Sequence, residues 1–505
     1  MALFLGIDLG TQSVKVAVFD EEGRFLSCTS REYPILTPQT GYAEQEPDIW
    51  WEKTVDAVRE GMETLPEKNV RAISFSGQMH GMVLLDETLR PLCPSIIWCD
   101  QRSFREVEDI RERLGHRLAE LAGSDIFTGF MAASFLWVKN HRPEVYRKIR
   151  WCMLPKDYLK IKMGLAPSSD VADASDTLLF DINTRHWSEE IIEALELDPS
   201  FFPPLHESSD VIGVLSQKTK EELGIMGEAL VIAGAGDQHC AALGNGLSQE
   251  GDTLITIGTG GQVFTSISTP VKDPDLRIHT FCHAIPHTWH LLGASLCAGL
   301  SLSWFKKSVL DQANHPFHYS ELDQEAEKVP AGGDGLLFLP YLIGERTPYK
   351  DSFARGAFLN LHLTHQRGHF IRAIMEGVGF ALNNSVDIFR SLGVSGKRFI
   401  FAGGGAKSEL WKQIIASIVG NPLITTTTRE EAATGAAILA MMGSHHFPSF
   451  DEAMKTLIHY HEPVSPVKEW EKIYQEQYQT FQALYPALKP FFPRNDAVLG
   501  MKFRS

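Results

Sequence analysis

The chain has 505 residues, of which 44% are hydrophobic and 22% are charged, and its formal net charge is −16. This length exceeds what a single hydrophobic core supports, so it predicts two domains of similar size. The acidic balance argues against a surface for nucleic acid or anionic membranes, and no segment approaches the ~18 consecutive apolar residues of a membrane span.

The first element is a hydrophobic run over residues 3–9 that carries Asp8 near its end. A Gly-Thr-Gln-Ser turn at residues 10–13 and a second apolar run follow, so the pattern predicts a strand, a tight turn and another strand. The hydroxyls of Thr11 and Ser13 and the backbone N–H groups of such a turn suit a phosphate. Asp8 suits a magnesium ion held through water; an ordinary hairpin with a polar turn is the alternative.

Polar side chains follow two further predicted strands, which span residues 70–76 and 95–98. The tripeptide Gln78-Met79-His80 comes after the first strand, and Asp100 comes after the second. An amide, a thioether and an imidazole at the end of a strand suit contact with a polyol, and Asp100 is expected to line the same cleft. The alternative interpretation is a packed methionine beside a structural histidine.

The strongest catalytic candidate is Asp237, which follows a predicted strand over residues 229–233 and a Gly-Ala-Gly turn. We expect it at the carboxyl end of a strand, where α/β sheets bind ligands. Phosphoryl transfer to a sugar hydroxyl requires alignment, charge neutralisation and a carboxylate that accepts the hydroxyl proton. Asp237 suits the last of these roles, and an Asx turn or a helix N-cap is the alternative.

A second hairpin is predicted over residues 252–268, where an apolar strand again ends in a turn, Gly258-Thr259-Gly260-Gly261. Two such turns, one in each half of the chain, suit the binding of a polyphosphate from two sides. Further along, a predicted strand over residues 399–402 leads into Gly403-Gly404-Gly405 and a helix with Ser408 as its N-cap. The glycines allow an adenosine to approach the backbone closely.

The remaining pattern alternates strands and helices, which predicts the α/β class. Apolar periodicity predicts helices over residues 104–121 and 430–442, and a strand over residues 423–428. The main domain boundary is expected at residues 246–251. Glu345 and Arg346 are expected to form an ion pair in a loop beside the cleft.

Other nucleotide-binding motifs are absent. The glycine spacing does not fit the G-x-G-x-x-G of dinucleotide-binding proteins, and no G-x-x-x-x-G-K-[ST] sequence of a P-loop occurs. Seven scattered cysteines without a CxxC pair make zinc improbable, and the N-terminus lacks the features of a signal peptide. Together these features indicate reduced thiols in a cytoplasmic protein.

Several motifs carry a resemblance to a known family: GIDLGTQSVK at residues 6–15, SGQMHG at 76–81, WCDQR at 98–102, LPKDYLK at 154–160 and LPYLIGERTP at 339–348. With them, the chain resembles the FGGY family of carbohydrate kinases over nearly its whole length. The resemblance implies an α/β, two-domain actin/hexokinase-like ATPase fold, built from duplicated ribonuclease H-like domains with a cleft between them. It also implies ATP with Mg²⁺ as the phosphoryl donor and a ketose as the acceptor.

The resemblance assigns roles to particular positions. Asp237 is implied as the general base and Asp8 as a second catalytic residue, and both are implied to hold magnesium, directly or through water. The residues expected to contact the sugar are Gln78, Met79, His80, Asp100 and Gln238. The residues expected to bind ATP are Thr11, Gln12, Ser13, Lys15, Gly258, Thr259, Gly404 and Gly405.

The expected domains are residues 1–247, which bind sugar and phosphate, and residues 248–488, which bind nucleotide, followed by a tail at residues 489–505. A homodimer is expected by the same resemblance. Met79 and His80 resemble the branch of the family that phosphorylates D-xylulose to D-xylulose 5-phosphate. The chain departs from the pattern in three places: Ser134 stands where the family has lysine, Gln238 stands where this branch has asparagine, and Gln12-Ser13 stands where this branch has Ser-Gly.

These departures leave the acceptor open among D-xylulose, ribulose, sedoheptulose and glycerol. An actin- or Hsp70-like ATPase without a sugar acceptor is the alternative from another functional class.

Overall fold

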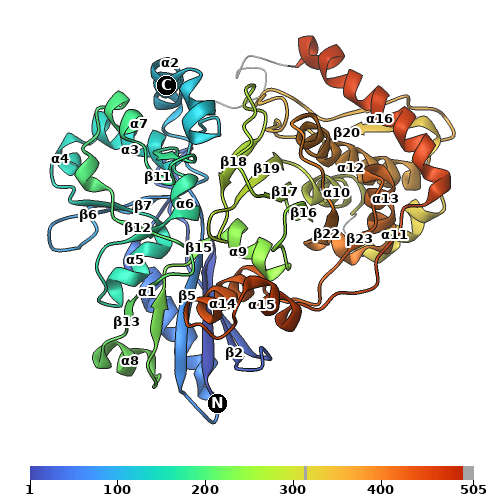
Figure 1. Cartoon of the computed structure of the whole chain (residues 1–505). Helices are drawn as coiled ribbons and strands as arrows, with labels where there is room; N and C mark the ends of the chain where they lie inside the picture. The colour runs from blue at the N-terminus through green and yellow to red at the C-terminus, as the bar shows by residue number, and fades with distance from the viewer. Residues whose placement is uncertain (312–315, 493–505) are drawn as a thin grey trace.

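The computed structural model describes residues 1–311 and 316–492. It consists of two halves, seen to the left and right in Figure 1, each built around a mixed β-sheet with helices packed on it. Within the described residues, no helix combines the length and hydrophobicity needed to cross a membrane.

The first sheet is formed by the N-terminal half in the order β13-β14-β5-β1-β2-β3, with β15 paired to β5. The predicted first hairpin is confirmed, because β1 and β2 pair antiparallel, and β5 runs parallel to β1. The strands are β1 (Leu3–Leu9), β2 (Ser13–Asp20), β3 (Phe25–Glu32), β5 (Val70–Gly77), β13 (Val211–Val214), β14 (Leu230–Ile232) and β15 (Ala235–Gly236).

The second sheet repeats this plan in the order β18-β19-β17-β16-β22-β23. Here β16 and β17 form the predicted second hairpin, and β22 runs parallel to β16 as β5 does to β1. The repeat confirms the expected duplicated α/β fold. The strands are β16 (Asp252–Ile257), β17 (Gly261–Ile267), β18 (His279–Cys282), β19 (Trp289–Ser295), β22 (Arg398–Ala402) and β23 (Leu423–Ile424).

Short strand pairs and helices complete the first half. The short strands are β4 (Glu44–Gln45), β6 (Val83–Leu85), β7 (Ser95–Ile96), β8 (Trp151–Met153), β9 (Ser169–Asp170), β10 (Phe180–Asp181), β11 (His186–Trp187) and β12 (Leu205–His206). The helices are α1 (Pro47–Glu63), α2 (Phe104–Leu114), α3 (Met131–His141), α4 (Pro143–Tyr146), α5 (Pro155–Lys162), α6 (Val171–Ser175), α7 (Glu189–Ala194), α8 (Gln217–Leu223) and α9 (Asp237–Gly244).

The second half is richer in helix. The expected N-cap Ser408 is confirmed, since its side chain accepts a hydrogen bond from the Trp411 N–H. The helices are α10 (Gly299–Phe305), α11 (Tyr319–Glu327), α12 (Arg367–Ser391), α13 (Glu409–Val419), α14 (Glu431–Gly443), α15 (Phe450–Leu457) and α16 (Lys468–Leu488), and a short strand pair joins β20 (Leu337–Leu339) to β21 (Ala357–Leu359).

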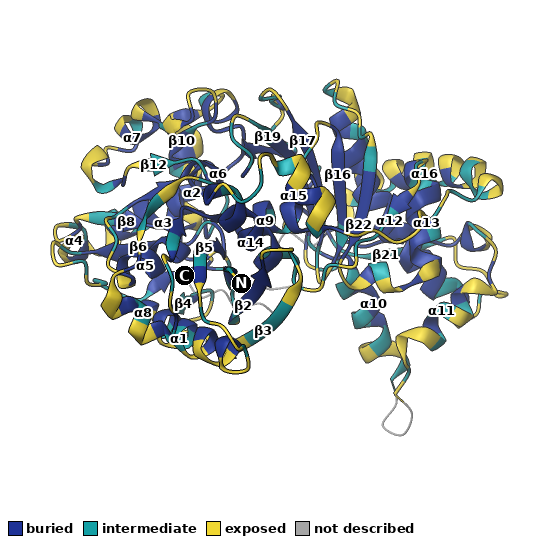
Figure 2. Ribbon diagram, turned by 60° about the horizontal axis from the view of Figure 1, so that its bottom comes forward, coloured by how far each residue is buried: buried dark blue, intermediate teal, exposed yellow. Residues whose placement is uncertain are grey.

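One late helix packs on the first half. Helix α14 lies against β1 and α9, between the two halves of the molecule, and its contact face is buried (Figures 1 and 2). Glycines permit this approach: a Cβ atom at Gly435 would overlap the Cys240 carbonyl, and one at Gly244 would overlap the Glu431 carbonyl. A Cβ atom at Gly6 of β1 would overlap the carbonyl of Ala433.

Three predicted elements are shorter than expected. The helix expected over residues 104–121 ends at Leu114, because Gly115 adopts a positive φ of 51° and a π-helical turn, Leu118–Ala122, follows. The strand expected over 95–98 stops at Ile96, since the chain turns where the Asp100 N–H donates to the Ile97 carbonyl. Likewise, the strand expected over 423–428 continues past Ile424 only as an isolated bridge between Thr426 and Tyr460.

The predicted tail at residues 489–505 is described only in part. Lys489–Phe491 form a single 3-10 turn after α16. The basic residues Arg494, Lys502 and Arg504, which the sequence places in this tail, lie outside the described residues.

The glycine contact makes a prediction for stability. We expect Gly435→Ala to lower the free energy of unfolding by about 1–3 kcal/mol, because the added methyl group must displace backbone. A loss of stability would indicate the close backbone contact, because a Gly→Ala substitution in an exposed helix raises the free energy of unfolding by about 1 kcal/mol. The measurement is urea unfolding followed by circular dichroism.

Gly379→Ala in α12 is the matched control, because its methyl group would meet only the side-chain ends of Ile418 and Ile415. An equal loss of stability in both variants would contradict the proposed close backbone contact.

Candidate active site

Three parallel strands of the first sheet end at the same edge. In the β1–β5 pair, Asp8 stands opposite Ser76, and in the β5–β15 pair, Gly236 stands opposite Gly77. Asp8, Gln78 and Asp237 therefore come together at the carboxyl ends of these strands, where α/β sheets bind ligands. The Ser76 hydroxyl donates a hydrogen bond of 2.7 Å to the Asp8 carboxylate.

Asp237 is the first residue of α9. Gly236 occupies the N-cap position, so the alternative interpretation of Asp237 as an N-cap is wrong. Burial raises the pKa of Asp237 to about 7, and the charges of Asp8 and Asp173 add to the increase. Hydrogen bonds from the backbone and side chain of Gln238 oppose it. A carboxyl group with this pKa is suited to accept a proton near neutral pH.

Met79 packs close to Asp237, and His80 is the next residue along the chain. A Cβ atom at Gly236 would lie 2.7 Å from Cγ of Met79, so methionine packs directly against the residue before Asp237. The His80 ring stacks on Phe130 with 3.9 Å between centroids, and its Nδ1 lies 2.9 Å from the Asp176 carbonyl oxygen.

The protonation of His80 follows from these contacts. Burial lowers the pKa of His80 to about 4, so the imidazole is neutral at physiological pH. Because a carbonyl oxygen only accepts, Nδ1 carries the proton that it donates to Asp176. Nε2 is then left with a lone pair that can accept a hydrogen bond from a hydroxyl group.

Gln78 is connected to the first turn through Gln45, the second residue of β4. Gln78 Nε2 donates to Gln45 Oε1 at 2.8 Å, and Gln45 Nε2 donates to the Thr11 carbonyl at 2.7 Å. Trp98 Nε1 donates to the Thr11 hydroxyl at 2.8 Å. Among the described residues, the buried Oε1 of Gln78 has no hydrogen-bond partner, so it is available to a ligand.

Asp100 has a different environment from the other expected sugar contacts. Its carboxylate is buried and accepts hydrogen bonds from the Ala43 N–H and from the Arg102 side chain and N–H. Arg102 also pairs with Glu44 at 2.7 Å. These partners show that Asp100 holds the segment around Ala43 in place, and its expected contact with the sugar stays a prediction.

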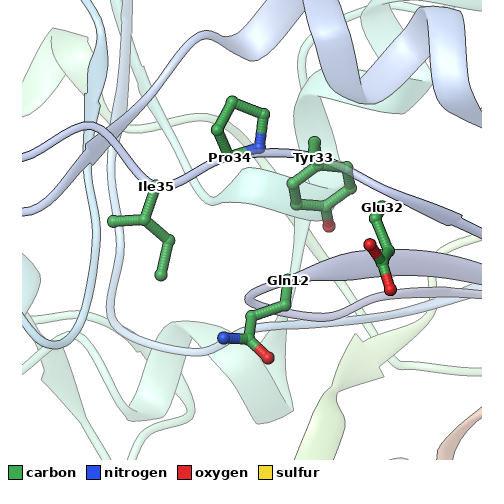
Figure 3. Close-up of a pocket in the computed structure, with 5 residues that line it drawn as sticks. All are labelled: Gln12, Glu32, Tyr33, Pro34 and Ile35. Carbon is green, nitrogen blue, oxygen red and sulfur yellow. The ribbon is translucent and has the colours of Figure 1, made fainter.

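The expected phosphate-binding turn is held from one side by Tyr33. The Tyr33 hydroxyl donates to the Gly10 carbonyl, and the Tyr33 N–H donates to the Gln12 carbonyl at 3.1 Å. An open pocket of about 530 Å³ lies beside this turn, lined by Gln12, Glu32, Tyr33, Pro34 and Ile35 (Figure 3).

Lys15 follows this turn on β2 and connects the two halves of the chain. Its Nζ forms an ion pair of 2.7 Å with Glu430, immediately before α14.

The second turn and the triple glycine also share one sheet edge, because β16 and β22 run parallel. The Ala298 N–H donates to the Thr259 carbonyl at 3.0 Å, and the Gly299 N–H donates to the Gly258 carbonyl at 2.9 Å. Gly404 and Gly405 begin a 3-10 turn, and a Cβ atom at Gly405 would lie 2.7 Å from the Ile257 side chain. The four expected nucleotide-binding residues of this half therefore gather at one edge.

A buried charge cluster behind Asp237 was missed at the sequence level. Lys156 Nζ lies 3.0 Å from Asp157, 2.6 Å from Asp170 and 2.8 Å from Asp173, and all four side chains are fully buried. The available signal was the LPKDYLK motif, whose lysine is followed directly by aspartate. The cluster anchors α6, and the Asp176 carbonyl that orients His80 follows at the end of this helix.

The comparisons with known proteins agree with this geometry. The FGGY family of carbohydrate kinases matches through its N-terminal domain over residues 3–244 and its C-terminal domain over residues 253–444. The chain belongs to this family. This carbohydrate kinase is 34% identical to the xylulose kinase of Staphylococcus xylosus over 96% of its own length and 100% of that protein. It is 36% identical to the xylulose kinase of Bacillus subtilis, over 91% of each chain.

A solved structure extends the comparison. The xylulose kinase of Rhodospirillum rubrum superimposes with a TM-score of 0.90 at 28% identity, over 97% of this chain and 99% of that one. Family membership confirms the predicted sugar kinase and makes ATP its co-substrate. The alternative of an ATPase without a sugar acceptor is wrong.

The buried charge cluster predicts an unequal effect of two lysine substitutions in α5. Lys156→Met leaves several buried carboxylates without their cation, and we expect a loss of about 3–5 kcal/mol in the free energy of unfolding. Lys162→Met removes a partly exposed ion pair with Asp48 and should cost no more than about 1 kcal/mol. Denaturant unfolding of both variants makes the comparison, and equal losses would contradict a structural role for the cluster.

Proposed function

We propose that this carbohydrate kinase transfers the γ-phosphoryl group of ATP to the terminal hydroxyl of D-xylulose, giving D-xylulose 5-phosphate. The observation that carries the proposal is the placement of Asp237, with its pKa near 7, beside Met79 and His80 at the shared strand edge. Relatives named xylulose kinase that match over nearly the whole chain support the choice of sugar.

In the proposed mechanism, Asp237 accepts the proton of the attacking hydroxyl while that oxygen is aligned with the phosphoryl group. The protein has little covalent work in such a transfer, so positioning and charge neutralisation dominate. His80 Nε2 accepts a hydrogen bond from a second hydroxyl of the sugar, while Met79 packs against its carbon skeleton. Gln78 and Gln238 supply the remaining polar contacts.

The chemistry of Asp8 and Asp237 fits Mg²⁺. This ion usually binds through one or two carboxylates together with waters and substrate phosphates. Burial raises the pKa of both carboxyl groups, and the charge of Asp8 raises that of Asp237 further, which a cation would relieve. We propose that both hold Mg²⁺, directly or through water; when bound, the ion neutralises charge on the transferred phosphate.

We propose that the two glycine turns share the nucleotide. In the first half, Thr11, Gln12, Ser13 and Lys15 would face the phosphates; in the second half, Gly258 and Thr259 would face the phosphates, and Gly404 and Gly405 the adenosine. The family matches over residues 3–244 and 253–444 support a functional boundary near residues 247 and 248.

A cytoplasmic location and a homodimer also belong to the proposal. All seven cysteines are free, which is consistent with the reducing environment of the cytoplasm. The homodimer stays a prediction from the family resemblance.

Asp237→Asn tests the proposed base. The amide keeps the shape of the side chain but does not accept the proton, so we expect kcat/KM for D-xylulose to fall about 10²- to 10⁴-fold. KM for ATP should stay within about twofold of wild type. The assay couples ADP release to NADH oxidation with D-xylulose, D-ribulose, sedoheptulose, glycerol or no sugar; full activity of the variant would rule out Asp237 as the base.

The pH dependence gives a second test. Only ionised Asp237 accepts a proton, and its pKa is raised to about 7. With MgATP limiting, so that most of the enzyme carries no ion, we therefore expect kcat/KM for D-xylulose to reach a plateau above this pH and to fall about tenfold per pH unit below it. An aspartate with an ordinary pKa would keep kcat/KM unchanged down to about pH 5. A flat profile between pH 5 and 7 would contradict this role of Asp237.

A further inference from the structure

Three cations surround one carboxylate and one aromatic ring where the two halves meet. Asp125, from the first half, is 5% exposed. Its Oδ1 lies 2.9 Å from Arg111 Nε, and its Oδ2 lies 3.2 Å from Lys350 Nζ of the second half. The third cation is Arg346, whose guanidinium carbon lies 5.4 Å from the centroid of the Phe127 ring. Asp125 is therefore already paired with the two other cations.

Arg346 has no such partner. The expected ion pair with Glu345 is not formed, because the buried Glu345 carboxylate is bound elsewhere: it accepts from the Ser295 hydroxyl at 2.6 Å, the Leu296 N–H at 3.0 Å and the N–H of Arg346 itself at 2.8 Å. Within residues 1–311 and 316–492, no carboxylate lies within ion-pair distance of the Arg346 guanidinium, and no group accepts a hydrogen bond from it.

The surroundings of Arg346 lead to the acceptor site. Phe127, beneath its guanidinium, lies 5.8 Å from Phe130, which stacks on His80. His279 lies 5.9 Å from Phe127 on another side. The charge of Arg346 also helps to lower the pKa of both His80 and His279, which places it close to these two neutral imidazoles. Arg346 is thus an unpaired cation from the second half, connected through Phe127 and Phe130 to a proposed sugar-binding residue of the first.

The guanidinium of Arg346 is half-buried and carries five N–H donors. Those donors that are buried lose water and gain no protein acceptor, which costs free energy. A sugar offers neighbouring oxygen atoms that match two of these donors at once.

We propose that Arg346 is a specificity-determining residue of the acceptor site, and that its guanidinium binds neighbouring oxygen atoms of the sugar. This proposal rests on the proposed sugar kinase activity. It makes the acceptor site depend on both halves of the chain, because His80 comes from one and Arg346 from the other.

The test is a comparison of Arg346→Gln, Arg346→Lys and Lys350→Gln with the wild-type enzyme. A hydrogen bond to a charged donor is strong, so we expect Arg346→Gln to raise KM for D-xylulose about 10- to 100-fold. KM for ATP should stay within about twofold. Arg346→Lys keeps the charge and loses the planar fork, so its KM for the sugar should lie between those of wild type and Arg346→Gln.

Lys350→Gln is the matched control, because Lys350 lies in the same loop and forms an ion pair with Asp125 of the first half. Its KM for the sugar should remain within about twofold of wild type. As a further readout, guanidinium ion at millimolar concentration should lower KM for the sugar in Arg346→Ala and leave the Lys350→Gln value unchanged. Thermal unfolding of each variant establishes that it is folded.

The outcomes separate this proposal from the proposed function. An active wild-type enzyme with an unchanged sugar KM in Arg346→Gln overturns the role of Arg346 alone. An equal rise of KM in Lys350→Gln also overturns it, since contact between the halves would then account for both effects. If the wild-type enzyme uses another sugar of the panel, the comparison is made with that sugar. If it phosphorylates none, both proposals fall.

Discussion

The close contact between α9 and α14 is the constraint on which the arrangement of the site depends. Asp237 begins α9, and α14 reaches this helix from the far end of the chain. Only hydrogen atoms fit at Gly244 and Gly435, where any side chain would overlap a backbone carbonyl. The second half therefore supports the helix that carries the proposed base. Lys15 and Glu430 add an ion pair at the start of the same contact.

The electrostatic character of the site follows from buried acids that outnumber their cations. Lys156 and Lys160 face Asp157, Asp170 and Asp173, with Asp176 one turn further. Burial, together with the neighbouring negative charges, raises the pKa of Asp173 to about 7 and that of Asp176 as well. At Asp237 burial is the largest cause, and the charges of Asp8 and of Asp173 from this cluster add to it, which explains why a carboxyl group in this place is a base near neutral pH and not a permanently ionised acid.

Much of the fold was predictable from local patterns. Both hairpins, the parallel strands that follow them and the Ser408 cap depend on apolar runs and turn residues close together in the sequence, and the family motifs added the duplicated architecture. Asp8, Gln78 and Asp237 were found because each stands at the end of an apolar strand.

The partners of charged side chains were not predictable in the same way. The Asp100 carboxylate accepts a hydrogen bond from the Ala43 N–H, and the Glu345 carboxylate accepts from the Ser295 hydroxyl and the Leu296 N–H. Only the folded chain creates these contacts. Neither periodicity nor spacing distinguishes a carboxylate that faces a ligand from one that holds a loop. For the same reason the role of Lys156 was missed, although its motif was visible.

The position of α14 also bears on the order in which the protein is made. The first sheet and α9 are complete once residue 244 has been synthesised, yet one of their apolar faces is covered mainly by residues 433–458. During synthesis on the ribosome, this face stays uncovered while almost the whole second half is translated, and exposed apolar surface of this kind favours aggregation. The nascent chain therefore passes through a long stage in which a finished half still lacks the helix that covers it.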